Sequence, residues 1–145
     1  MILSSSEIAR RLRGCEGEGD LVIEPYSEEC QQPASYDLRV GSDFVLPPGI
    51  CTLVSTLERV ELPSDLAATL RCRSSFGRRG IVLTAGFVDP GFRGQLTLCL
   101  VNMGAEHLTL RKNDRVVQMI FHQVTDGRST YCGRYQDSTG VIQAR

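Results

Sequence analysis

Hydroxyl and guanidinium side chains gather in one stretch of the sequence, and a carboxylate on a tight turn follows them. Arg73-Ser74-Ser75 and Arg78 come first, and Asp89-Pro90-Gly91-Phe92-Arg93-Gly94 comes next. Guanidinium forks and hydroxyls bind phosphate oxygens, and an aspartate can take a proton from water. Glycine in the turn lets the backbone approach a flat base closely. This order of residue types predicts a site for a nucleoside triphosphate.

The composition limits the other classes of function. A chain of 145 residues predicts one domain, 1–145, with a single core. With 16 basic and 17 acidic residues the net charge is -1, which argues against nucleic acid or a membrane surface as a partner. The residues after Met1 lack the apolar run of a signal peptide or a membrane-spanning helix. We therefore expect a cytoplasmic protein.

Cysteine and histidine do not form a metal-binding pattern. The six cysteines contain no C-x-x-C pair, which argues against a zinc ribbon or finger. An even number leaves a disulfide framework open, although free buried thiols are favoured without a secretory signal. His107 and His122 lie 15 residues apart, and we interpret both as strand or loop residues.

A short helix is predicted at the N-terminus. Ser4-Ser5-Ser6-Glu7 is typical of a capping box, and Leu3 and Ile8 are placed to form a hydrophobic staple. The pattern predicts a helix from about Ser5 to Leu12. Three glycines, Gly14, Gly17 and Gly19, would end it.

Short apolar runs follow, with turn residues every 8–12 positions, which predicts an antiparallel sandwich or barrel. The predicted strands are 21–23, 44–46, 51–55, 67–71, 81–84, 95–102, 108–110, 116–124 and 131–133. Within 95–102 the leucines alternate with Gln95, Thr97 and Cys99, so these three share the opposite face. Residues 133–145 have little to bury, and we expect them to be mobile without a ligand.

The ordered motifs resemble the superfamily of trimeric dUTPases and dCTP deaminases over nearly the whole chain. The helix and segments 23–25, 32–39, 56–63 and 89–92 resemble the deaminase branch, and Arg73-Ser74-Ser75 is common to both branches. Segments 113–118 and 138–140 are similar to the fourth and the C-terminal dUTPase motifs. The resemblance implies an all-β, distorted jelly-roll β-barrel (dUTPase-like β-clip) with a short N-terminal helix. It also implies a homotrimer with sites between subunits.

The resemblance also assigns roles to residues. Asp89 would activate water, Phe92 would pack against the deoxyribose, and the backbone of 84–88 would read the base edge. The implied contacts are Thr84, Ala85, Gly86 and Val88 for the base; Arg73, Ser74, Ser75, Arg78 and Gln118 for the phosphates; and Arg134, Tyr135, Ser138, Thr139 and Gly140 in a mobile arm, 133–145, that closes over the nucleotide. Asp37 would hold waters of a triphosphate-bound Mg²⁺. Structural interpretations stay open: a turn aspartate for Asp89 and Asp37, a core ring for Phe92 and an exposed strand residue for Gln118.

One position departs from the deaminase pattern. Leu96-Thr97-Leu98-Cys99 stands where deaminases have Leu-x-Leu-Glu, whose glutamate moves protons at the cytosine ring. A thiol is a poor substitute for a carboxylate in that role. The sequence therefore predicts a dUTP diphosphatase that converts dUTP to dUMP and pyrophosphate with Mg²⁺. The alternatives are a dCTP deaminase, a bifunctional enzyme, or a nucleotide-binding regulatory protein without turnover.

Overall fold

The N-terminal helix begins as its capping pattern predicts. The computed structural model describes residues 1–13 and 20–144, and α1 spans Ser5–Arg11. The hydroxyl of Ser4 accepts a hydrogen bond from the Glu7 backbone N–H at 3.3 Å. Leu3 and Ile8 are both buried, as expected for a staple. The predicted ending at Gly14, Gly17 and Gly19 lies outside the described residues, as does Cys15.

Strands make up most of the remaining elements. Their bounds are β1 (Val22–Glu24), β2 (Gln31–Gln32), β3 (Ser35–Arg39), β4 (Phe44–Leu46), β5 (Cys51–Glu61), β6 (Leu66–Cys72), β7 (Ile81–Leu83), β8 (Phe87–Val88), β9 (Arg93–Asn102), β10 (Leu108–Leu110) and β11 (Arg115–Gln123). A 3-10 turn, η1, spans Glu28–Cys30, and a one-turn helix, α2, spans Ser74–Gly77. The predicted all-β architecture with a short N-terminal helix is confirmed.

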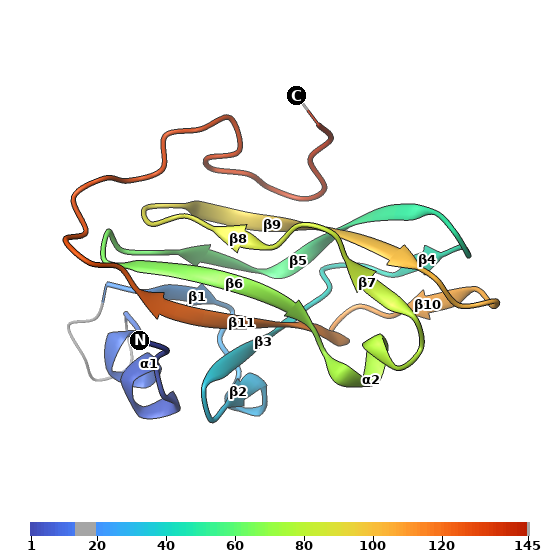
Figure 1. Ribbon diagram of the computed structural model, residues 1–145, viewed down its shortest axis with the longest axis horizontal. Coiled ribbons are helices and arrows are strands. Elements are labelled where there is room, and N and C mark those ends of the chain that lie inside the picture. Colours follow the sequence, from blue (N-terminus) through green and yellow to red (C-terminus); the bar gives the residue numbers. More distant parts are fainter. Residues whose placement is uncertain (14–19, 145) are drawn as a thin grey trace.

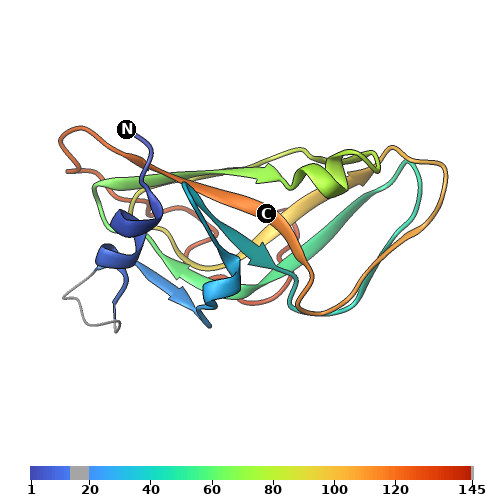
Figure 2. The same ribbon diagram turned by 90° about the horizontal axis from the view of Figure 1, so that it is seen from below.

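Two antiparallel sheets form the sandwich. One has the order β1-β5-β9-β7 and the other β2-β3-β11-β6-β8, while β4 and β10 form a separate pair. The helix α1 lies at one end of the sandwich, and the β4–β10 pair lies at the other end (Figures 1 and 2). Leu98 and Leu100 of β9 are buried with Tyr36 and Phe121 of the other sheet in one core. The alternation predicted within 95–102 is therefore confirmed.

A buried ion pair ties β3 to β5 beside an irregularity in the latter strand. The register of β5 against β9 shifts between Ser55 and Arg59. At this point the Glu58 carboxylate is fully buried and accepts hydrogen bonds from Arg39 Nε at 2.6 Å and from the Arg39 backbone N–H at 2.9 Å. Arg39 also donates to the carbonyl of Pro25 at 2.6 Å. One guanidinium thus joins three segments of the chain.

Two differences from the sequence-based strands have physical causes. The predicted strand 131–133 is wrong, because Tyr131 lies in a loop where its backbone N–H donates to Pro90 O at 2.7 Å. The strand β3 was not predicted, because two of its buried residues, Ser35 and Asp37, are polar and mask the apolar pattern.

The C-terminal arm lies alongside β9 (Figure 1). Its Ser138 carbonyl accepts from the Gln95 backbone N–H at 2.8 Å, and the Asp137 backbone N–H donates to Arg93 O at 2.9 Å. Ser138 and Gly94 form an isolated parallel bridge. The arm therefore docks on its own chain, and its mobility without a ligand stays a prediction.

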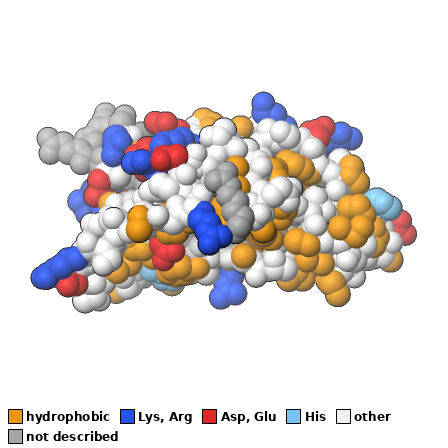
Figure 3. Space-filling view, turned by 90° about the horizontal axis from the view of Figure 1, so that it is seen from above, with side chains coloured by type: hydrophobic (Ala, Val, Ile, Leu, Met, Phe, Trp, Pro, Cys, Tyr) orange, Lys and Arg blue, Asp and Glu red, His pale blue; other side chains and the backbone are white. Residues whose placement is uncertain are grey.

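The thiols and surface of the described residues add two facts. The five described cysteines are free, as predicted, but among them only Cys30 is buried, and Cys51 and Cys132 are exposed. Beside the arm, hydrophobic side chains gather over the end of the sandwich that carries β4 and β7 (Figure 3). The exposed apolar residues at this end are Val45 of β4, Val82 of β7, Ile50 just before β5 and Met103 just after β9. Within the described part of the chain, no helix is both long and apolar enough to cross a membrane.

Candidate functional site

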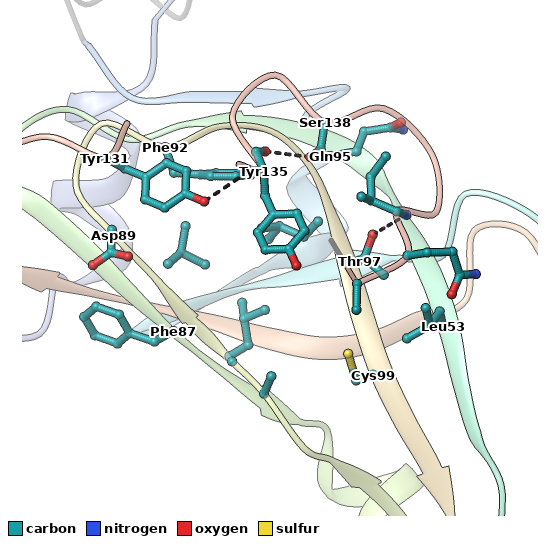
Figure 4. A pocket seen from close by; sticks show the side chains of 18 residues that line it. Leu53, Phe87, Asp89, Phe92, Gln95, Thr97, Cys99, Tyr131, Tyr135 and Ser138 are labelled. Atoms are coloured by element: carbon teal, nitrogen blue, oxygen red, sulfur yellow. Dashed lines mark hydrogen bonds between the residues drawn. The ribbon is translucent and has the colours of Figure 1, made fainter. Parts of the chain in front are cut away.

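A pocket of about 530 Å³ opens between the β8–β9 turn and the C-terminal arm (Figure 4). Most of its wall is apolar. The lining residues are Leu53, Leu70, Ala85, Gly86, Phe87, Val88, Asp89, Phe92, Gln95, Leu96, Thr97, Cys99, Tyr131, Tyr135, Ser138, Ile142, Gln143 and Ala144. Among these, Asp89 supplies the single carboxylate. A concave, largely apolar site with few polar groups is typical of small-molecule binding.

Backbone hydrogen bonds fix the turn that carries Asp89. The Phe92 backbone N–H donates to Asp89 O at 3.2 Å and closes the turn. Leu62, just after β5, accepts from the Gly91 backbone N–H at 3.0 Å and donates to Phe92 O at 2.9 Å. Gly91 adopts a φ of 78°, which favours glycine. The turn therefore presents Asp89 at the pocket from a defined backbone.

Replacing Gly91 with alanine is expected to disturb this turn. An added Cβ would lie 2.5 Å from Thr130 Cβ, whereas one on Gly49, at a similar φ of 74°, would meet nothing within 4 Å. Both changes carry the left-handed backbone cost of about 1–2 kcal/mol. Gly91→Ala adds a packing cost of about 1–3 kcal/mol. Urea unfolding of both variants measures the difference, and equal losses of stability would contradict this account of the turn.

Aromatic rings form the roof of the pocket next to Asp89. Phe92 is 7% exposed and meets Tyr131 edge to face, with ring centroids 5.8 Å apart and planes at 61°. Tyr135 points into the same space (Figure 4). Tyr131 was missed as a site residue, because its apolar neighbourhood was interpreted as a strand. Together these rings can enclose a flat or sugar-sized group beside the carboxylate.

One face of β9 forms the far wall. Gln95 and Thr97 both bind the arm: Gln95 Oε1 accepts from the Gly140 backbone N–H at 2.7 Å, and Thr97 Oγ1 accepts from the Ile142 backbone N–H at 3.0 Å. The predicted alternation had placed these residues on one face with Cys99 but gave them no role. Burial raises the pKa of the Cys99 thiol above its ordinary value of 9.0, which disfavours the thiolate, the form that could accept a proton.

The predicted base-reading segment is only partly at the pocket. Ala85, Gly86 and Val88 line it, but Thr84 does not. The Thr84 backbone N–H donates to Cys99 O at 3.0 Å, and Gly86 O accepts from the Leu70 backbone N–H at 2.6 Å. These bonds fix the segment against β9 and β6, and its contact with a base stays a prediction.

The predicted phosphate-binding residues do not line this pocket. Arg73, Ser74, Ser75 and Arg78 belong to α2 and its caps, which lie on the side of the strands away from the arm (Figure 1). Gln118, on β11, is also absent from the lining. Of the predicted arm residues, Tyr135 and Ser138 line the pocket, whereas Arg134, Thr139 and Gly140 do not. One chain therefore does not bring the guanidinium set and Asp89 together.

Asp37 lies beside the guanidinium set, in the interior. Its side chain is 1% exposed, with Oδ2 at 3.0 Å from Arg73 Nε and 3.8 Å from Arg115 Nη1. Burial raises the pKa of Asp37, and the two guanidiniums oppose this rise. Residues 1–13 and 20–144 contain no group of three potential metal ligands. Beyond these ion pairs, neither Asp37 carboxylate oxygen has a hydrogen-bond partner among the described residues, and the role of Asp37 toward Mg²⁺-bound water stays a prediction.

Comparisons with known proteins point to one family. The family model described as dCTP deaminase-like matches residues 41–124. The dCTP deaminase of Pyrococcus horikoshii is 41% identical, over 85% of this chain and 89% of that protein. The dCTP deaminase of Halorubrum lacusprofundi is 38% identical, over 100% of this chain and 91% of that protein.

Solved structures support the fold. The dCTP deaminase of Agrobacterium tumefaciens has a TM-score of 0.68 at 23% identity, covering 85% of this chain and 47% of that chain. The EIAV dUTPase has a TM-score of 0.63 at 18% identity, covering 81% of this chain and 99% of that chain. These likenesses confirm the predicted dUTPase-like jelly-roll fold, and the family model and the relatives confirm the predicted resemblance.

The same comparisons correct the predicted reaction. The relatives at 38–41% identity over most of the chain are named dCTP deaminases, so the prediction of a dUTP diphosphatase is wrong. The prediction of a dUTP diphosphatase gave the single side chain of Cys99 more weight than the several segments that resemble the deaminase branch. A different carboxylate, Asp89, lines the same pocket.

Proposed function

Because the chain belongs to the dCTP deaminase-like family, we propose that it catalyses the hydrolysis of dCTP to dUTP and ammonia. The observation that carries the proposal is the 41% identity to a dCTP deaminase over 89% of that relative's length. An open, largely apolar pocket with the exposed carboxylate of Asp89 at one end supports it. The superfamily consists of nucleotide enzymes, and the reaction assigned to this chain is our inference.

The chemistry needs a group that moves protons. Water adds to C4 of the cytosine ring, one of its protons passes to the ring nitrogen, and the amino group leaves as ammonia after it accepts the second. A positioned carboxylate can relay both protons. We assign this role to Asp89, because it supplies the single carboxylate among the residues that line the pocket. Phe92 and Tyr131 would restrict water beside it.

The triphosphate would be held by a second copy of the chain. Arg73, Ser74 and Ser75 supply the groups that bind phosphate, yet they lie away from the pocket of their own chain. A homotrimer with shared sites, as the family resemblance implies, would bring them to the Asp89 pocket of a neighbour. The exposed apolar side chains Val45 and Met103 supply surface for such packing.

The deciding experiment incubates the purified protein with dCTP and separates the products. We expect equal amounts of dUTP and ammonia. Pyrophosphate without ammonia would contradict the proposal, as would the recovery of unchanged dCTP. The measurement uses chromatography for the nucleotides and a coupled enzyme assay for ammonia.

A second candidate function is nucleotide binding without turnover, and Cys99 favours it. The thiol stands where the resemblance places the glutamate that moves protons, and burial raises its pKa, which disfavours the thiolate. Binding of dCTP with no product of any kind would support this candidate over deamination.

Placing a carboxylate at this position is expected to raise deamination. Cys99→Glu adds a proton carrier on the pocket face of β9, and we expect ammonia release to rise about 10-fold or more. Thr109→Glu is the control, because Thr109 is exposed on β10 and does not line the pocket. Equal rates in Cys99→Glu and the parent would show that this position plays no part in the proton transfers.

A further inference from the structure

The side chain of Gln136, in the C-terminal arm, forms hydrogen bonds with the Asp89 turn. The sequence assigned no role to this residue. Gln136 Oε1 accepts from the Arg93 backbone N–H at 3.0 Å, and Gln136 Nε2 donates to Gly91 O at 2.9 Å. These two backbone groups stand on either side of Phe92. The amide therefore bridges the turn as a neighbouring strand would, with one bond donated to the turn and one accepted from it. The same Nε2 also donates to Tyr131 O at 3.4 Å, outside the turn.

The opposite edge of the turn belongs to the main fold. There Leu62 binds the backbone of Gly91 and Phe92 with bonds of 3.0 and 2.9 Å. The turn is thus paired along both edges, once by a residue next to β5 and once by the side chain of Gln136. The pairing of the second edge, by Gln136, depends on the position of the arm.

The neighbouring arm residue contributes differently. The Asp137 carboxylate pairs with the Arg93 guanidinium, but both side chains are more than half exposed. Exposed ion pairs add little to stability. The contact of Gln136 with Gly91 is part-buried and reaches the turn backbone itself. Besides the backbone bonds from Tyr131 to Pro90 O and from Asp137 to Arg93 O, Gln136 is therefore an arm side chain that can set the shape of the turn.

We propose that Gln136 is a positioning residue whose amide couples docking of the arm to the geometry of the Asp89 turn. The inference rests on the proposed function, because its kinetic effect is on deamination of dCTP. Gln136 does not line the pocket, so it acts through Asp89 and Phe92. A misplacement of reacting groups by about 1 Å can cost about 100-fold in rate.

Two variants of Gln136 and one control variant distinguish its donated hydrogen bond from its accepted one. Gln136→Ala removes both hydrogen bonds. Gln136→Glu keeps the shape and can still accept from Arg93, but an ionised carboxylate cannot donate to Gly91 O. Gln123→Ala is the matched control, because Gln123 is exposed at the end of β11, outside the pocket.

Two measurements on the full-length protein test the coupling. For Gln136→Ala we expect kcat for dCTP to fall about 10-fold with KM within about 2-fold. Hydrogen exchange at the Arg93 amide should become about 3–10-fold faster, because its acceptor is lost. Gln136→Glu should lower kcat while it leaves that amide protected. All three variants should melt close to the parent.

An unchanged kcat or an unchanged Arg93 exchange rate in Gln136→Ala overturns the inference. So does a loss of kcat that Gln123→Ala matches. If the parent releases no ammonia, the proposed function fails by itself. In that case Arg93 exchange alone decides on Gln136, and the inference is overturned when the exchange rate is the same in Gln136→Ala and the parent.

Discussion

Asp89→Asn is expected to lower the rate of dCTP deamination by about 10²–10⁴-fold, the usual range for loss of a positioned general acid–base group. The amide keeps the shape of the side chain and its place on the turn but cannot relay protons. Binding of dCTP should change much less, because the phosphates are assigned to Arg73 and its neighbours. Steady-state kinetics and calorimetric binding measure the two effects separately.

Asp126→Asn is the control for this experiment. Asp126 lies outside the pocket, pairs with Arg128 and has a φ of 72°, which asparagine tolerates. Its turnover should match the parent. Near-parental turnover in Asp89→Asn would move the proton transfers to another group. Loss of dCTP binding in the same variant would assign Asp89 to substrate binding instead.

Glu58→Ala should destabilise the fold by about 3–5 kcal/mol, the typical cost of breaking a buried ion pair by removing one partner. Glu58 is fully buried, and its loss leaves the Arg39 guanidinium, 16% exposed, without its carboxylate. The Arg39 backbone N–H loses its acceptor as well. Urea unfolding followed by circular dichroism measures the change in free energy.

Glu28→Ala provides the comparison, because Glu28 is exposed in η1 and should change stability by less than about 0.5 kcal/mol. If Glu58→Ala cannot be purified folded, Glu58→Gln tests the same pair. Its amide oxygen can still accept one of the two bonds from Arg39, so a smaller loss is expected. Parental stability in Glu58→Gln would show that the ion pair contributes nothing to the fold.

Local patterns predicted the elements whose stability is encoded nearby in sequence. The start of α1 depends on Ser4, Glu7 and the Leu3–Ile8 pair, all within six positions. The strand β9 follows from strict alternation. By contrast, β3 was missed, because its buried Asp37 is paired with Arg73, 36 positions away, and a local pattern cannot reveal such a partner.

The site was predictable in part for the same reason. The turn residues Asp89 and Phe92 form one short motif, and both line the pocket. Tyr131 and Ile142 line the pocket because the C-terminal segment folds back onto the sandwich. Their backbone N–H groups donate to Pro90 O and to Thr97 Oγ1, which lie far away in the sequence. The error about the reaction had another cause: a missing glutamate at one position does not exclude a carboxylate elsewhere in the same pocket.

The burial of Cys99 also divides the thiols by chemical reactivity. The thiolate is the nucleophile, and burial raises the pKa values of Cys30, Cys72 and Cys99, so these three react slowly near neutral pH. Cys51 and Cys132 are exposed and meet an alkylating reagent first. Cys132 adjoins Tyr131 at the start of the arm, outside the pocket lining. A fluorophore attached there can follow the arm while the pocket thiol stays unmodified.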